Sequence, residues 1–369
     1  MGKEGLSGRC SGGQRVNEID LLRFVAAMAV VFYHYAFRGF AGGDRTTMAY
    51  PLLESVAKYG FMGVELFFMI SGFVILMTAA NGSLRKFVVS RIARLYPAFW
   101  VCCSLTFLAI LLIGGPRFSA TFMQYLVNMT MLNGFVRVAS IDGVYWSLFV
   151  EIQFYAMVSA VLMLGLISRA QALLLAWLAA TVALAIVPNP VLRFLLITDY
   201  APYFIAGAVF YLVWSSGANG VRCGMLAACL GLALRDALGG LPLFEQRYDT
   251  RMSRGTVVAI IVSYFVAMGM VALRWTGPLL RRRWLLAGAL TYPLYLLHQN
   301  IGYMIFNLAH PALDPHLVFW GTLALVLFAS WLVHAGVERR YTGQFMRACD
   351  GAVDAGAGLL RRVGTGRWR

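Results

Sequence analysis

A chain of 369 residues that is 60% hydrophobic and only 13% charged differs sharply from a soluble protein. Soluble domains average about 45–50% apolar and about 25% charged residues, so a water-soluble globule is excluded, as are a disordered chain, a collagen-like repeat and a disulfide scaffold. Sixty per cent of the chain is about 221 residues, and ten membrane-spanning helices of about 20 residues each would use about 200 of them. The composition therefore predicts an integral membrane protein.

The charged residues are unequally divided, with 31 Lys and Arg against 16 Asp and Glu, a net charge of +15. In a membrane protein such an excess is expected of basic residues that hold loops on the cytoplasmic side. Nucleic-acid binding is disfavoured because no basic run alternates with aromatic residues. The six cysteines include no C-x-x-C pair, so we expect neither a disulfide framework nor a metal site.

The first apolar stretch, Leu21 to Phe37, follows Asp20 and contains Arg23 and His34, which the core of a cleavable signal peptide would avoid. Helices are expected for apolar runs of this length, because lipid cannot satisfy backbone polar groups. A shorter stretch, 121–135, is predicted to lie at the interface or to re-enter the membrane. We predict spans at 20–39, 55–79, 95–113, 145–167, 170–187, 200–215, 221–238, 256–273, 284–306 and 317–336.

Ten spans place both termini on one side of the membrane. The segments predicted on that side contain about twice as many Lys and Arg residues as the segments on the other side. This bias predicts that both termini are cytoplasmic. The fold class is thus an all-α integral membrane protein, a bundle of about ten transmembrane helices. We expect a cytoplasmic N-terminal tail at 1–14, one membrane domain at 15–345 and a basic cytoplasmic C-terminal tail at 346–369, with no internal repeat. Nothing in the pattern predicts the oligomeric state.

Ionisable residues inside a span are costly and mark candidate sites. Arg23 and His34 are eleven residues apart, so on a helix they lie within about 20° of one face, separated by a rise of roughly 16 Å. Asp20 precedes Arg23 by three residues and can pair with it. Imidazole is a suitable general base near neutral pH, so His34 is a candidate catalytic residue. The alternative is a packed histidine that hydrogen-bonds a neighbouring span.

Carboxylates that could act with this histidine are Glu65 in the second span, Glu151 in the fourth and Glu338 at the end of the last. The second span reads GVELFFMISGF, in which Ser71 and Gly72 allow a close approach between helices. The fourth reads YWSLFVEIQFY, in which Ser147, next to Trp146, lies four residues before the glutamate and on the same face. For each glutamate the alternative is a structural hydrogen bond.

Two further segments carry polar residues of interest. In SRIARLYP, Arg91 and Arg94 are neighbours on a helix face and could clamp phosphates; the alternative is an anchor to lipid head groups. In TYPLYLLHQN, Pro293 interrupts the helical hydrogen bonds, and His298 either lines a cavity or fixes the kink.

Together these segments resemble the bacterial membrane acyltransferases called acyltransferase family 3. The matching text is NEIDLLRFVAAMAVVFYH, GVELFFMISGFVI, SRIARLYPAFW, YWSLFVEIQFY and TYPLYLLH, in the expected order over roughly residues 15 to 345. The Arg23–His34 spacing looks like the family's hallmark, and Arg91 with Arg94 looks like its cytoplasmic Arg-x-x-Arg. Each motif alone is weak, but five in order are specific.

The resemblance implies about ten helices and the transfer of an acyl group from acyl-CoA to an acceptor hydroxyl. It implies that His34 is the acyl-transfer histidine and that Arg91 and Arg94 bind the CoA phosphates. Glu338 looks like the family's acidic residue near the end of the last span, although Arg340 stands where the family often has proline. The chain resembles the short form, without the periplasmic esterase-like domain, that acetylates exopolysaccharides in the bacterial inner membrane.

We therefore expect acetyl transfer, with acetyl-CoA as a co-substrate and no permanently bound cofactor. The expected acceptor is a hydroxyl of an envelope polysaccharide or of its lipid-linked precursor. We expect Asp20 and Arg23 to organise the cytoplasmic mouth, and Glu338 or Glu151 to orient His34. The predicted substrate-binding set is Asp20, Arg23, Arg91, Arg94, Trp146, Ser147, Glu151 and His298. Alternatives are a lipid, antibiotic or peptidoglycan acceptor, or a transporter, against which the absence of an inverted repeat counts.

Overall fold

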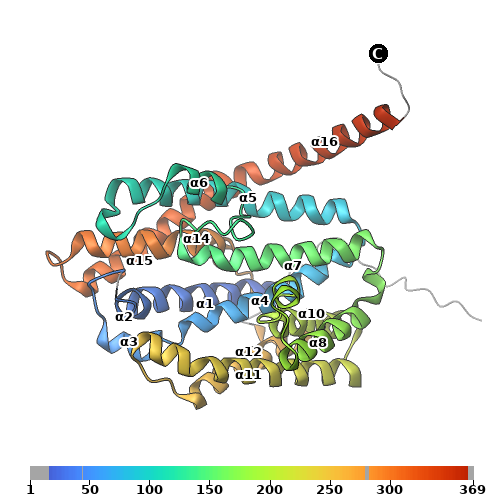
Figure 1. Ribbon diagram of the computed structural model, residues 1–369, viewed down its shortest axis with the longest axis horizontal. Coiled ribbons are helices and arrows are strands. Elements are labelled where there is room, and N and C mark those ends of the chain that lie inside the picture. Colours follow the sequence, from blue (N-terminus) through green and yellow to red (C-terminus); the bar gives the residue numbers. More distant parts are fainter. Residues whose placement is uncertain (1–15, 44, 279–281, 365–369) are drawn as a thin grey trace, which may run out of the picture.

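The computed structural model describes residues 16–43, 45–278 and 282–364, with side chains as far as residue 355; the predicted tail at 1–14 lies outside these ranges. The described residues form a bundle of helices and contain no strand, which confirms the predicted fold class (Figure 1). The long helices are α1 (Asn17–Tyr33), α4 (Gly63–Ala79), α5 (Leu84–Ile113), α7 (Trp146–Met163), α8 (Ala170–Ile186), α10 (Ala201–Ser216), α11 (Gly220–Tyr248), α12 (Arg254–Ala272), α14 (Leu285–Ala309), α15 (Pro315–Val333) and α16 (Arg339–Gly364).

Shorter elements join these helices at both ends of the bundle. The ones used below are η1 (His34–Arg38), α2 (Gly39–Ala41), α3 (Pro51–Ala57), η2 (Gly60–Met62), α6 (Phe122–Asn128), η4 (Gly143–Tyr145), α9 (Pro190–Leu195) and η6 (His334–Glu338). Within the described residues, eight helical segments are long and apolar enough to cross a membrane. Each of the ten predicted spans falls on a helix, while the number ten and the side of the termini stay predictions.

The seventh predicted span, 221–238, is too short. The structure continues α11 to Tyr248, through Gly239, Gly240 and Pro242, so only a few residues connect it to α12. Glycine and proline weaken a helix, which is why the sequence indicated an end at this point. The correction places Gly240 and Phe244, which border cavities described below, on the helix instead of in a loop.

Among the described helices, α4 and α10 make the most extensive contact with each other. A Cβ atom on Gly72 would collide with the carbonyl oxygen of Phe204, and one on Gly207 would collide with that of Met69. The two helices therefore touch backbone to backbone, as small residues permit in membranes. The expectation that Gly72 allows a close approach is confirmed, and the crossing holds α4, with Glu65 on it, against α10.

Helix α1 packs against α4 and α14 at the centre of the bundle. At His34 its hydrogen bonding widens into the π-helix η1, which ends at Arg38. Such π segments are rare and occur often at functional sites. The local widening sets the direction of the His34 side chain relative to α14.

The predicted C-terminal tail, 346–369, lies on α16 as far as Gly364, and residues 365–369 are outside the described ranges. Helix α16 extends away from the bundle (Figure 1). Arg85 at the start of α5 forms ion pairs with Asp350 (2.9 Å) and Asp354 (2.5 Å) of α16. These contacts tie the middle of α16 to the end of the bundle at which α5 begins.

Candidate active site

His34 faces a second histidine from the other end of the sequence. Its Nδ1 lies 2.8 Å from the carbonyl oxygen of Val30 and 3.1 Å from Nε2 of His298 on α14. Nδ1 of His298 lies 3.1 Å from the carbonyl of Leu294 and 2.9 Å from that of Tyr295. The two rings therefore meet edge to edge, each turned back toward its own helix.

These contacts assign the protons of the neutral pair. A carbonyl oxygen only accepts hydrogen bonds, so Nδ1 of each ring carries the hydrogen. Nε2 of His298 then accepts from His34 Nδ1–H, and Nε2 of His34 keeps a free lone pair. His34 is thus oriented as a proton acceptor, with His298 as its positioning residue. The Tyr35 hydroxyl supports the pair by donating to the carbonyl of His298 (2.8 Å).

The histidine cavity, with a volume of about 580 Å³, is bordered by His34. Its volume is within the range of small-molecule sites, about 300–1,000 Å³. Its wall is partly aromatic and partly polar, and includes Arg38, Glu65, Trp146, Tyr200, Phe244, Tyr295 and Gln299. A reacting group placed there would meet the free nitrogen of His34.

A narrow polar passage, the neck, continues from the histidine cavity along α1. It has a volume of about 70 Å³ and shares Val64 and Tyr295 with that cavity. At its centre Glu151 accepts hydrogen bonds from Ser71 (2.9 Å) and Tyr155 (2.5 Å). Its polar lining residues are Arg23, Ser71, Arg94, Ser147, Glu151, Tyr155, Thr291, Tyr292 and Tyr295.

Beyond the neck lies the mouth cavity, of about 560 Å³, at the end of the bundle where α1 and α14 begin. It shares Arg23, Arg94 and Tyr292 with the neck, so the three cavities form one series. The guanidinium groups of Arg23 and Arg94 thus lie where the mouth cavity meets the neck. Because α1 carries both Arg23 and His34, the series runs roughly 16 Å along that helix.

The structure places the predicted residues along this series. Asp20, Arg23, Arg94 and Glu338 border the mouth cavity, Ser147 and Glu151 the neck, and His34 and Trp146 the histidine cavity. Arg91 interacts with Tyr155 and Glu151 beside the neck. Ser147 shares a hydrogen bond of 2.7 Å with Tyr295.

Two expectations about the neighbours of His34 differ from the geometry. Glu338 accepts from Nδ1 of His334 (2.7 Å) on its own π-turn η6, at the mouth and away from His34. Glu151 bonds Ser71 and Tyr155 in the neck. Neither carboxylate is in the described hydrogen bonds of His34, whose side-chain partner is His298. Sequence spacing could not show this pairing because 264 residues separate the two histidines.

Comparison with known proteins adds a family assignment. A family model described as "Acyltransferase domain" matches residues 16–335. A relative named "Nodulation protein 10" from Rhizobium leguminosarum bv. viciae is 33% identical over 173 residues, which cover 41% of this chain and 45% of the relative. A "Putative acetyltransferase ORF330" from Acidianus two-tailed virus is 28% identical over 134 residues, 36% of this chain and 37% of the relative. The matched regions thus span less than half of each relative, and no solved structure matches the chain.

Proposed function

Since the chain belongs to acyltransferase family 3, we propose that it is a membrane-bound O-acyltransferase that moves an acetyl group from acetyl-CoA to a hydroxyl of an envelope or extracellular polysaccharide or its lipid-linked precursor. The observation that carries the proposal is the free Nε2 of His34 at one end of a series of cavities whose other end has two arginines. The acetyl group is supported by a relative named as a putative acetyltransferase.

The donor enters at the mouth cavity in this proposal. Guanidinium groups bind phosphate through paired hydrogen bonds, which suits Arg23 and Arg94 to the phosphates of CoA. Arg91 adds positive charge beside the neck. The narrow neck then takes the pantetheine arm, whose extended length can bridge the rise from Arg23 to His34. This positioning brings the thioester to the histidine cavity.

The reaction at His34 is a proton transfer coupled to acyl transfer. Nε2 takes the proton of the acceptor hydroxyl, the hydroxyl oxygen forms a bond to the thioester carbonyl carbon, and the carbon–sulfur bond breaks. The proton then passes to the departing thiolate, so the products are the O-acetyl ester and free CoA. In the two-step version Nε2 bonds to the carbonyl carbon as the carbon–sulfur bond breaks; the acceptor oxygen then bonds to that carbon as the bond to Nε2 breaks, and the hydroxyl proton passes to the thiolate. General-base catalysis of this kind supplies about 10²–10⁴-fold, and fixed positioning supplies the rest.

The orientation in the membrane is part of the proposal. The bias of Lys and Arg puts the mouth, α16 and both termini in the cytoplasm, where acyl-CoA is found. The protein would then be a multi-pass protein of the bacterial inner membrane, with the bilayer around it. No bound cofactor is needed by the chemistry above.

The test uses inverted membrane vesicles that carry the wild type, His34→Ala or His316→Ala at matched protein level. Labelled acetyl-CoA and the glycan fraction of the source bacterium are added, and acetyl that mild base releases from the glycan is counted. We expect label with the wild type and with His316→Ala, because His316 is exposed outside the three cavities. Equal label with His34→Ala would remove His34 from the reaction, and no label with the wild type would overturn the proposed acetyl transfer.

A further inference from the structure

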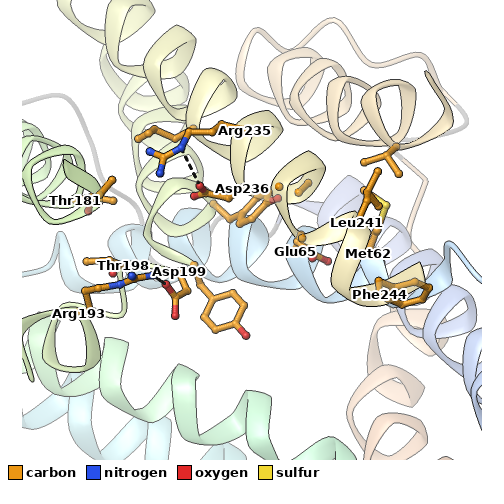
Figure 2. Close-up of a pocket in the computed structure, with 18 of the residues that line it drawn as sticks. Met62, Glu65, Thr181, Arg193, Thr198, Asp199, Arg235, Asp236, Leu241 and Phe244 are labelled. Carbon is orange, nitrogen blue, oxygen red and sulfur yellow. Dashed lines mark hydrogen bonds and ion pairs between the residues drawn. The ribbon is translucent and has the colours of Figure 1, made fainter. Parts of the chain in front are cut away.

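A fourth cavity, the side cavity, adjoins the histidine cavity from another direction. It has a volume of about 590 Å³ and lies among η2, α4, α8, α9, α10, α11 and α12 (Figure 2). It shares Phe61, Glu65, Tyr200, Gly240 and Phe244 with the histidine cavity. It shares no residue with the neck or the mouth cavity. A second molecule could therefore reach His34 without passing the proposed donor path.

Two polar atoms in the side cavity are buried without a hydrogen-bond partner. They are Oε2 of Glu65 and Oγ1 of Thr198. Buried polar groups are nearly always satisfied, and an unsatisfied one is costly. Figure 2 shows these side chains on different sides of the cavity, with Glu65 coming from α4 and Thr198 from the segment that follows α9. Their free positions indicate a ligand with hydroxyl groups.

The charges in the side cavity indicate a ligand without a net negative charge. Arg193 pairs with Asp199 at 2.6 Å, and Arg235 pairs with Asp236 at 3.7 Å (Figure 2). The arginines are thus matched by carboxylates, and Glu65 adds a further acidic group. An anion would find no unmatched cation among the described lining residues. Paired donors and acceptors suit the alternating hydroxyls of a sugar.

An aromatic pair stands at the junction of the cavities. Tyr200 lines both the side and the histidine cavity, and its ring centroid is 5.4 Å from that of Trp146. Trp146 is 42% exposed. Rings that combine an apolar face with a polar edge are well suited to amphipathic ligands, and the C–H face of a sugar ring is such a surface.

We propose that the side cavity is the acceptor site, that it binds a neutral saccharide, and that Glu65 accepts a hydrogen bond from the acceptor hydroxyl that faces His34. This inference rests on the proposed function and specifies its acceptor. Arg193 and Asp199 lie in the connection between α8 and α10, which by the alternation of the helices is at the end opposite to the mouth. Donor and acceptor thus meet at His34 from opposite ends of the bundle.

Two glycines on α11 allow a direct test. A Cβ on Gly239, which lines the side cavity but not the histidine cavity, or on Gly231, which is exposed and lines neither, meets nothing within 4 Å. Gly239→Trp therefore fills part of the side cavity, and Gly231→Trp is its matched control on the same helix. Two rates are measured for each: acetyl transfer to the glycan fraction, and the slower release of CoA from acetyl-CoA when no glycan is present.

We expect Gly239→Trp to lower glycan transfer at least about 10-fold while acceptor-free CoA release stays within about twofold of the wild type. Gly231→Trp should keep both rates. Unchanged transfer in Gly239→Trp would show that the acceptor enters elsewhere, and an equal loss of both rates would assign the side cavity to the donor. A wild type without CoA release or transfer would instead contradict the proposed function itself.

Glu65→Gln and Thr198→Val test the hydroxyl contacts, with Glu54→Gln as a control on α3 outside the cavities. We expect the first two to raise KM for the glycan about 5–10-fold and to leave KM for acetyl-CoA unchanged. Equal changes in the two KM values would overturn the assignment of Glu65.

The charge argument is tested by separating the labelled glycan on an anion exchanger. We expect label in the neutral pool, and label only in the anionic pool would overturn the proposal of a neutral acceptor.

Discussion

At the scale of single residues, the proposed chemistry depends on a histidine that is oriented by another histidine. A carboxylate partner would add a negative charge to a desolvated site, and that charge is costly unless it is paired. Neutral His298 avoids this cost and still accepts the hydrogen bond from His34 Nδ1. Its own ring is fixed by the carbonyls of Leu294 and Tyr295.

The hydrogen bond from His34 to His298 can be removed or imitated. His298→Leu should lower kcat about 10–100-fold, because His34 loses the acceptor that holds its ring, while KM for acetyl-CoA should change less than about threefold. His298→Gln should recover part of kcat, because its amide oxygen can accept the same bond. Steady-state kinetics on purified protein in lipid nanodiscs gives both values. If the two variants lose kcat equally, the hydrogen bond is not what His298 contributes.

Arg94 is expected to recognise the phosphates of the donor. Arg94→Gln should raise KM for acetyl-CoA about 10-fold or more, because a charge-assisted phosphate contact is lost. With the acetyl thioester of N-acetylcysteamine, which has no phosphate, wild type and variant should have the same kcat/KM. Arg169→Gln serves as a control for the loss of one basic residue, since Arg169 lies outside the described cavities. An equal defect with both thioesters would mean that Arg94 supports the neck and not the phosphates.

The sequence predicted the residues that lie close together along the chain. The eleven-residue spacing of Arg23 and His34 places both on one series of cavities, and the positions of Arg94 and Glu151 on that series agree with their proposed involvement. It could not predict the contact with His298, which depends on how α1 packs against α14. The surroundings of Glu65 could not be predicted either, because its cavity is lined by several helices that are far apart in the sequence.

At the scale of elements, the crossing of α4 and α10 fixes the wall between the neck and the side cavity. The hydrophobic runs predicted both helices, and Gly72 in the sequence indicated a close contact. The partner Gly207 was not predicted, because nothing local distinguishes it from the other glycines. In α11 the prediction ended the span at 238, whereas the helix continues through Gly239, Gly240 and Pro242 to Tyr248.

Gly207→Ala adds one methyl group at this crossing. The added Cβ would collide with the backbone carbonyl of Met69, so we expect a loss of about 1–3 kcal/mol of stability, seen as a lower melting temperature in detergent. Gly224→Ala on α11 meets open space and should be neutral or slightly stabilising, because alanine favours the helix by about 0.5–1 kcal/mol over glycine. Equal melting temperatures for the two variants would show that α4 and α10 separate easily.

At the scale of the whole molecule, the proposal requires that the two ends of the bundle face different compartments. The mouth cavity and the start of α11 belong to one end, and α9 belongs to the other. Acyl-CoA is cytoplasmic, whereas an envelope glycan is met outside. The excess of basic residues at the mouth end is the physical reason to place that end in the cytoplasm, since translocating such segments is unfavourable.

Cysteine labelling tests this orientation. The start of α11 and the segment before α9 belong to opposite ends of the bundle. Ala218, between α10 and α11, and Pro188, between α8 and α9, are exposed and lie outside the predicted spans at these two ends. With Cys10, Cys223 and Cys349 replaced by serine, a membrane-impermeant maleimide should label Ala218→Cys in inverted vesicles but not in intact spheroplasts. Pro188→Cys in the same background should show the reverse. The reversed pattern for both sites would place the arginines of the mouth cavity outside the cell, away from acyl-CoA. The proposed direction of transfer would then be wrong, even if His34 is essential.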